Sequence, residues 1–311
     1  MSDARAVSFV ETVEHLRFVE FCEACRRDRY IGLCYGPPGV GKTFSARRYA
    51  RWEAVSSYSK RRVAGGVSLN DALSDVAFYS VPVVNSAAGV LKEVAGLRTR
   101  LRDLVQADIE RQKEIRIAEV RKVELEVEQD ELRRGVRWSL SYRTGEASID
   151  RIDELHLEYG RRCLEAADPT ALLLVDEADR LRMAGLEQLR DISDRDGIGL
   201  VLIGMPGLER RLSRYAQLYS RVGFVHAYRP LSATDVARLI REGWASGVAL
   251  PGQGIADEEA VAAIVRITGG NFRLLDRLLT QVGRVLSLNG LEAVTREVVE
   301  TAREVLVIGA V

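Results

Sequence analysis

Short apolar runs alternate with amphipathic segments from residue 8 to residue 229 of the chain. Each run is rich in Val, Leu and Ile, which predicts buried β-strands. The runs occupy residues 30–35, 76–84, 171–175, 199–204 and 222–227. Apolar residues between them recur at helical spacing, for example over residues 8–29 and 43–56. Strands that alternate with helices predict an α/β fold, with a parallel sheet covered on both faces.

The pattern changes after Pro230, where helical spacing replaces the strand signals. Helices are expected there because a Thr, Asp or Asn begins each periodic segment and suits a helix N-cap. The segments are residues 234–244, 257–267, 271–288 and 295–305. The sequence therefore predicts an α/β domain over residues 1–229 and a smaller, all-helical lid domain over residues 230–311.

The stretch between the second and third predicted strands is unusually long, and residues 97–148 form an insertion in the α/β domain. Leucines from Leu97 to Leu104 lie at near-heptad spacing, but Asp108 and Arg111 interrupt the seam. Charged residues at seam positions argue against a long coiled coil.

The second half of the insertion carries a different pattern. Residues 123–127 and 138–142 alternate strictly between apolar and polar side chains, and the stretch between them is polar. Strict alternation on both sides of a polar turn predicts a β-hairpin, here standing on helical stems. One continuous charged helix is the alternative for the same residues.

Composition restricts the possible functions. The 311 residues include 45 basic and 45 acidic side chains, so the formal net charge is zero. Hydrophobic residues make up 47% and charged residues 29%, which is typical of a globular chain and excludes a wholly disordered one. A neutral chain does not hold nucleic acid through overall charge, so any such binding depends on local basic patches.

The cellular compartment follows from two absences in the sequence. No apolar run approaches the roughly 20 residues of a membrane span, and no signal-peptide pattern is found. Cys22 and Cys25 form a CxxC pair, but no second pair completes a zinc site. We therefore expect free thiols in a cytoplasmic protein that has no membrane partner.

The motif GPPGVGKT at residues 36–43 matches the G-x-x-x-x-G-K-[ST] phosphate loop, with a predicted strand before it and a helix after it. Glycines let successive backbone N–H groups face the phosphates, and the following helix adds its positive end. A lysine then reaches the β- and γ-phosphates, and a hydroxyl ligates Mg²⁺. The expected ATP contacts are Gly36, Pro37, Pro38, Gly39, Val40, Gly41, Lys42, Thr43 and Phe44.

The third predicted strand ends in carboxylates. In folds of this kind it lies next to the phosphate-loop strand, so Asp176 is expected to hold Mg²⁺ together with Thr43. Glu177 is then placed to polarise the attacking water as a general base. The letters DEAD at residues 176–179 do not indicate a helicase, because no second α/β half follows.

Two arginines are candidates for charge stabilisation at the γ-phosphate. Arg221 directly precedes the fifth predicted strand, where it can point into a neighbouring subunit, with Arg214 as the second choice. Arg273 opens a helix of the lid domain in the run GGNFR and can fold over the phosphates. Solvated surface arginines are the alternative reading of all three.

Together, the phosphate loop, the apolar strand ending in Asp-Glu, Arg221 and the GGNFR helix resemble the AAA+ ATPases. Within that family, the layout is similar to the transposition regulators MuB, TniB and TnsC. The resemblance implies a five-stranded parallel sheet of order 5-1-4-3-2. It also implies ATP-dependent assembly into rings or helical filaments on duplex DNA, and recruitment or stimulation of a transposase.

One departure from the family concerns the end of the fourth strand. A polar residue is expected there, but the chain has Gly204 and Met205, so hydrolysis is expected to be slow. Other functions stay open. A protein-remodelling or signalling ATPase would bind its protein partner through the insertion, and a helicase loader would deliver a ring helicase.

Clusters of basic residues are candidate DNA contacts, because phosphate contacts need charge and no base-reading helix. The expected contacts are Lys60, Arg61, Arg62, Lys92 and Arg98. A solvated charged surface is the alternative for each cluster. In an oligomer these residues would repeat once per subunit, so a neutral chain could still present a positive channel.

Overall fold

The computed structural model describes residues 9–59, 67–134, 140–241 and 258–306 of the chain. Its sheet contains five strands in the order β2-β3-β4-β1-β5, which confirms the expected order. The strands are β1 Ile31–Tyr35, β2 Val76–Ser80, β3 Leu172–Asp176, β4 Gly199–Gly204 and β5 Val222–Ala227. β1, β3 and β4 are almost entirely buried, as expected of central strands covered on both faces.

The register of the sheet brings three strand ends together. β1 pairs in parallel with β4 and β5, and β3 pairs in parallel with β4. Tyr35 lies opposite Gly204, and Val175 lies opposite Leu202. The segments that follow β1, β3 and β4 therefore leave the sheet at the same edge.

The helices of the α/β part differ from expectation in two places. The first, α1 Val13–Asp28, begins later than residue 8 because the hydroxyl of Thr12 accepts the His15 N–H and caps it. The single helix predicted over residues 43–56 is two helices, α2 Lys42–Tyr49 and α3 Trp52–Ser57. Arg51 lies between them in a left-handed conformation, at a φ of 51°, which interrupts the helix. The remaining short elements are α4 Leu69–Ala72, η1 Ala178–Arg180, α7 Met183–Asp196, α8 Leu208–Leu212 and α9 Ala216–Tyr219.

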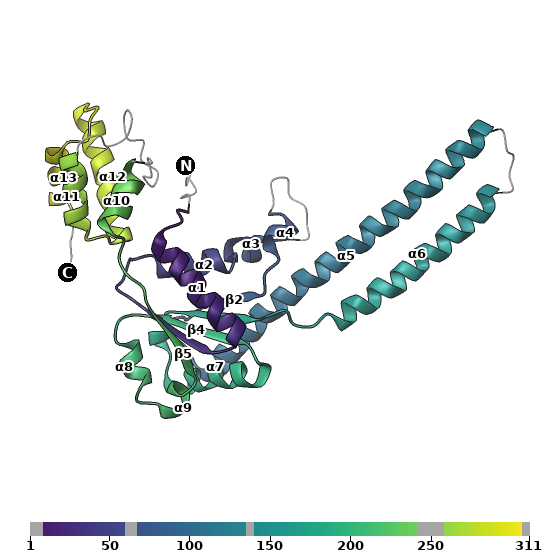
Figure 1. Cartoon of the computed structure of the whole chain (residues 1–311), viewed down its shortest axis with the longest axis horizontal. Coiled ribbons are helices and arrows are strands. Elements are labelled where there is room, and N and C mark those ends of the chain that lie inside the picture. The colour runs from purple at the N-terminus through teal and green to yellow at the C-terminus, as the bar shows by residue number, and fades with distance from the viewer. Residues whose placement is uncertain (1–8, 60–66, 135–139, 242–257, 307–311) are drawn as a thin grey trace. The chain divides into compact units, whose positions relative to one another are not determined.

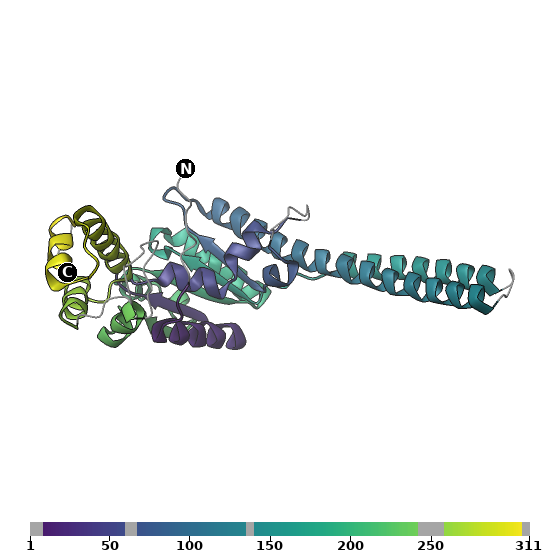
Figure 2. The same cartoon turned by 90° about the horizontal axis from the view of Figure 1, so that it is seen from above.

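The insertion is helical, and the predicted β-hairpin is wrong. α5 runs from Ala87 to Arg134 and α6 from Leu140 to Glu165, and the two lie side by side in both views (Figures 1 and 2). Residues 123–127 belong to α5, while residues 138 and 139 lie outside the described part. The alternation misled because Glu, Leu and Lys are strong helix formers and no Gly or Pro interrupts the second half of α5.

A small apolar cluster joins α5 to α6. Its buried members are Ile109 of α5 with Leu155 and Tyr159 of α6. The polar interruption of the heptad pattern is neutralised locally, because Arg111 donates to the Asp108 carboxylate at 2.6 Å on the same helix. α5 therefore continues through Asp108 and Arg111, although their charges had argued against a coiled coil.

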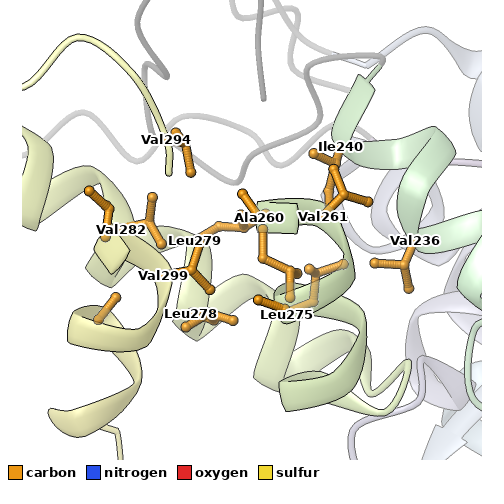
Figure 3. Packing of buried hydrophobic residues seen from close by; sticks show 14 of the residues in the cluster. Val236, Ile240, Ala260, Val261, Leu275, Leu278, Leu279, Val282, Val294 and Val299 are labelled. Carbon is orange, nitrogen blue, oxygen red and sulfur yellow. The ribbon is translucent and has the colours of Figure 1, made fainter. Parts of the chain in front are cut away.

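The described residues beyond Pro230 form helices around a core of their own. The helices are α10 Ala233–Arg241, α11 Glu258–Thr268, α12 Phe272–Asn289 and α13 Arg296–Glu304. Asn271 and Thr295 cap α12 and α13. Thr234, which was expected to begin a helix as its N-cap, lies inside α10, and the Ser232 hydroxyl accepts the Asp235 N–H instead. Leu275, Leu278 and Val299 are fully buried among these helices (Figure 3). The predicted residues Trp244 and Asp257 lie outside the described part of the chain.

By internal contacts the chain divides into two compact units. One consists of Met1–Tyr49, Ser80–Val90 and Leu172–Val311, and the other of Ala50–Tyr79 and Leu91–Ala171. The first unit holds the phosphate loop and the C-terminal helices, and the second holds most of the insertion. The domain boundary near residue 229 stays a prediction. Among the described residues, no helix has both the length and the apolar character needed to cross a membrane.

Candidate functional site

The phosphate-loop motif lies between β1 and α2, as its pattern requires. Gly39 and Gly41 adopt φ angles of 80° and 110°, which side-chain-bearing residues rarely tolerate. These angles bend the backbone around the start of α2, where the first N–H groups of a helix lack internal partners. The loop is therefore shaped to offer N–H donors to an anion.

Lys42 is the first residue of α2, and its ammonium lies inside the curve of the loop. The Nζ atom donates to the carbonyl oxygens of Gly36 at 2.6 Å and of Pro37 at 2.7 Å. Burial lowers the pKa of Lys42, while the negative charges of Asp176 and Asp179 oppose that shift. A buried ammonium held by carbonyl dipoles is well suited to pair with phosphate oxygens.

The hard oxygen ligands expected for magnesium meet at this edge of the sheet. Thr43 Oγ1 donates to Asp176 Oδ2 at 2.7 Å, and the Glu177 N–H donates to Asp176 Oδ1 at 3.0 Å. Burial raises the pKa of the Asp176 carboxyl, and these two hydrogen bonds oppose the rise. A hydroxyl beside a carboxylate fits Mg²⁺, which uses few protein ligands and keeps several waters.

Glu177 follows Asp176 in a left-handed conformation, at a φ of 56°. Its carboxylate forms an ion pair with Arg180, three residues along the chain. Arg180 in turn donates to the carbonyl oxygen of Val81 at 2.9 Å, just beyond β2. The structure thus places Glu177 at the expected strand end but with its carboxylate held by Arg180, so its role as general base stays a prediction.

Two lid residues touch the phosphate loop directly. Asn271 donates from Nδ2 to the carbonyl oxygen of Pro38 at 2.8 Å, and the Arg273 N–H donates to the Gly39 carbonyl oxygen at 3.0 Å. The charge of Arg273 also lowers the pKa of Lys42, although less than burial does. The start of α12 is therefore attached to the loop, and a contact of Arg273 with phosphate stays a prediction.

A pocket of about 540 Å³, counting its open mouth, lies beside the loop. Its walls are mostly apolar, which is typical of small-molecule sites. Its apolar walls come from four separate parts of the chain: Phe9, Val10, Val40, Phe44, Leu231 and Phe272. His15 also lines it, whereas Phe18 is fully buried behind it. The pocket suits the base of a nucleotide whose phosphates lie in the loop.

Sequence patterns did not identify most of the residues that line this pocket. Phe9 and Val10 precede α1 instead of lying within it, and Tyr228 follows β5. Tyr228 shares a 2.7 Å hydrogen bond with Ser45, and burial raises the pKa of its phenol beyond the usual range. No motif marks such residues, because only folding brings them together.

Arg221 lies at the opposite edge of the sheet from the loop of its own chain. Its carbonyl oxygen accepts the Ile31 N–H at the start of β1, whereas the loop begins after Tyr35. A strand of five residues spans about 16 Å. The Arg221 side chain is 57% exposed and approaches Asp194 at 3.6 Å. It therefore does not reach the phosphate site of its own chain.

The candidate DNA contacts are placed unevenly. Lys92 is exposed on α5, whereas Arg98 donates from Nε to Asp168 at 2.5 Å and is 20% exposed. Arg100, a neighbour of Arg98 in sequence, donates to the carbonyl oxygens of Val55, Ser56 and Tyr58. Residues 60–62 lie outside the described part of the chain.

A carboxylate from another part of the chain lies beside the end of β4, and the sequence patterns did not place it there. Gly204 and Met205 carry no polar side chain, but the Met205 N–H donates to Asp179 Oδ1 at 3.1 Å. Asp179 belongs to the turn after β3 and is the last letter of the DEAD run. The sequence shows this carboxylate in the DEAD run, but only the fold brings it beside Gly204.

The comparisons with known proteins agree with this geometry. A family model described as "AAA domain" matches residues 25–212. A "Potential ATP-binding protein" of Staphylococcus aureus is 36% identical over 313 residues, covering 97% of each chain. The "Mu-like prophage FluMu DNA transposition protein B" of Haemophilus influenzae is 34% identical over 113 residues, which cover 33% of this chain and 36% of that protein.

Among solved structures, a mutant of RuvB from Thermotoga maritima aligns with a TM-score of 0.53 at 16% identity. The alignment covers 97% of this chain and 73% of that one. At this identity the likeness concerns the fold alone. Because the family model spans more than half of the chain and the staphylococcal relative spans nearly all of it, this chain belongs to the AAA ATPase family and resembles MuB.

Proposed function

We propose that this chain is an ATP-hydrolysing, DNA-binding AAA ATPase that assembles on target duplex DNA and recruits or stimulates a transposase. The observation that carries the proposal is the Thr43–Asp176 pair beside Lys42 in a chain of the AAA family. The partial similarity to a protein named for DNA transposition supports the choice of DNA and transposase as partners.

The nucleotide site divides its work among the described residues. The loop N–H groups and Lys42 bind the ATP phosphates, and the pocket beside them holds the base. Thr43 and Asp176 would hold Mg²⁺, which supplies charge neutralisation at the phosphates when bound. Glu177 deprotonates the attacking water once its carboxylate leaves Arg180. Arg273 supports the phosphates from the lid.

Oligomerisation completes the site in this proposal. Arg221 lies at the far end of β1 from its own loop, so it serves the phosphate site of a neighbouring copy. A positive charge supplied across an interface stabilises the charge that develops in phosphoryl transfer. ATP hydrolysis is therefore coupled to a ring or helical filament of this chain.

Duplex DNA is bound through phosphate contacts, which suit a target that is not chosen by sequence. Lys60, Arg61, Arg62 and Lys92 are the proposed contacts, together with Arg98. Arg98 would have to exchange its partner Asp168 for a phosphate. Because each copy repeats these residues, an oligomer multiplies the few contacts that one copy makes.

The test combines the full-length chain with random-sequence duplex DNA at several salt concentrations. With a slowly hydrolysed ATP analogue we expect tight DNA binding that weakens steeply with salt, and rings or filaments by negative-stain electron microscopy. With ADP we expect weaker binding and fewer oligomers. If neither binding nor oligomers appear with the analogue at low salt, the proposal is wrong.

A protein-remodelling or signalling ATPase is the second candidate. The observation that favours it is the helical hairpin of α5 and α6, whose Arg98 and Arg100 are engaged within the protein while Leu157 of α6 is 70% exposed. In that case the hairpin would bind a protein and DNA would have no effect on assembly. A helicase loader would instead bind a ring helicase. A pull-down with that helicase would distinguish a loader from the other two functions.

A further inference from the structure

The last residue of β4 is shaped to admit the Asp179 carboxylate. A Cβ atom built on Gly204 would lie 2.7 Å from Asp179 Oδ1, which is closer than real side-chain contacts allow. The Met205 N–H next to it donates to the same oxygen at 3.1 Å. The glycine therefore leaves space for a carboxylate that arrives from the neighbouring strand.

The turn that holds Asp179 is fastened in place by an arginine. Arg211 of α8 donates to the carbonyl oxygen of Asp179 at 2.7 Å and also to that of Leu181. Leu181 is almost completely buried, and its N–H donates to the Ala178 carbonyl oxygen at 3.1 Å. The carboxylate is thus positioned by backbone contacts on two sides and needs little ordering when a ligand binds.

The same carboxylate is part of the electrostatics of the phosphate site. Burial sets the direction of the pKa shift of Lys42, and the negative charge of Asp179 is among those that oppose it. The charge of Asp179 also acts on Asp176, adding to the rise in pKa that burial causes there. Asp179 is exposed to solvent and lies in the turn directly after Glu177. Gly204 pairs with Tyr35, the residue just before the loop, so the Asp179 carboxylate lies beside the strand end that adjoins the phosphate loop.

We propose that Asp179 orients the attacking water in ATP hydrolysis, by accepting a hydrogen bond from it at the end of β4. Asp179 supplies from the turn after β3 what a polar side chain at Gly204 or Met205 would otherwise supply. Glu177 remains the base that takes the proton. This assignment rests on the hydrolysis that is part of the proposed function.

The Asp179→Asn variant separates this role from a structural one. An asparagine keeps an oxygen that accepts the Met205 N–H, so a purely structural contact would survive the change. Loss of the negative charge makes the side-chain oxygen of residue 179 a weaker hydrogen-bond acceptor for the attacking water. We expect kcat to fall by about tenfold or more, while KM and the affinity for labelled ADP change by less than about threefold.

A second readout does not depend on turnover. ADP with aluminium fluoride mimics the phosphoryl group in transit, so its retention reports the geometry of the attacking side. We expect Asp179→Asn to weaken that complex and to leave ADP alone unchanged. Asp191→Asn on α7, whose carboxylate pairs with Arg195 on the same helix, is the matched control and should behave as the wild type.

The outcomes are distinguishable. If the wild-type chain hydrolyses ATP and Asp179→Asn turns over and traps aluminium fluoride equally well, Asp179 has no role and the proposed function is unaffected. If the wild type shows no turnover with or without duplex DNA, the hydrolase function and this role both fail. Gly204→Ala, which presses a methyl group against Oδ1, should reproduce the loss of kcat and add little to Asp179→Asn.

Discussion

Thr43 Oγ1 donates a 2.7 Å hydrogen bond to Asp176 Oδ2 across 133 residues of sequence. The bond joins the first turn of α2 to the end of β3, so that two oxygen ligands suited to Mg²⁺ lie side by side at the loop. Asp176 is buried, and its carboxylate is also held by the Glu177 N–H.

Thr43→Ala is expected to remove the magnesium-dependent part of nucleotide binding. The change deletes the hydroxyl and leaves Asp176 without its side-chain partner, so affinity for labelled ATP with Mg²⁺ should fall by about tenfold or more. Affinity measured in the presence of a chelator should not change. Thr43→Ser, which keeps the hydroxyl, is the matched control. Equal Mg²⁺ dependence in all three proteins would contradict the metal assignment.

Glu177→Gln is expected to slow ATP hydrolysis by about a hundredfold, because an amide does not accept the proton of the attacking water. ATP-bound oligomers should then accumulate, which size-exclusion chromatography with radiolabelled ATP would detect. Glu187→Gln on α7, where the carboxylate pairs with Arg190, serves as the control. Unimpaired turnover of Glu177→Gln would remove this residue from the role of base.

Arg221→Ala and Lys42→Ala are each expected to be inactive alone and partly active when mixed. An Arg221→Ala subunit keeps a competent nucleotide site, and a neighbouring Lys42→Ala subunit still supplies Arg221 to it. If subunits mix at random, up to about a quarter of the interfaces are restored. Steady-state ATP hydrolysis of the mixture, compared with the separate variants, measures this. No recovery in demonstrably mixed oligomers would place Arg221 outside the site.

Leu278→Ala is expected to destabilise the C-terminal helices by about 3 kcal/mol, because it leaves a cavity in a closely packed core. Leu278 is fully buried between the helices around α12 (Figure 3). Leu288→Ala on the same helix is the control, since Leu288 is 87% exposed. Urea unfolding followed by circular dichroism compares the two. Equal midpoints would show that this core contributes little to stability.

The insertion shows where pattern reasoning failed. Residues 123–127 alternate as a strand does, yet they continue a helix whose contacts with α6 recur at helical spacing, for example at Val105, Ile109, Ile117 and Val120. A five-residue window does not distinguish the two periods when its charged residues favour helices. A longer stretch of α5 shows the helical period, but its apolar positions can be recognised only once the partner helix α6 is known.

The sequence by itself determined the local chemistry. The phosphate loop, the Asp176–Glu177 strand end and the N-caps Asn271 and Thr295 depend on backbone conformation and near neighbours, and the structure has them where the motifs indicate. The order of the sheet followed from the family that these motifs resemble and is confirmed. Such features are encoded within a few residues, which is why they can be read without a fold.

Only the tertiary structure decided which distant side chains share the site. Phe9 and Phe272 meet at one pocket, Asp179 reaches the end of β4, Glu177 is held by Arg180, and Arg221 lies at the far edge of the sheet. These relations depend on strand register and helix packing, which join residues far apart in sequence. Local sequence patterns do not reveal such pairings, because the sequence around each residue is the same whether or not the two residues meet in the fold.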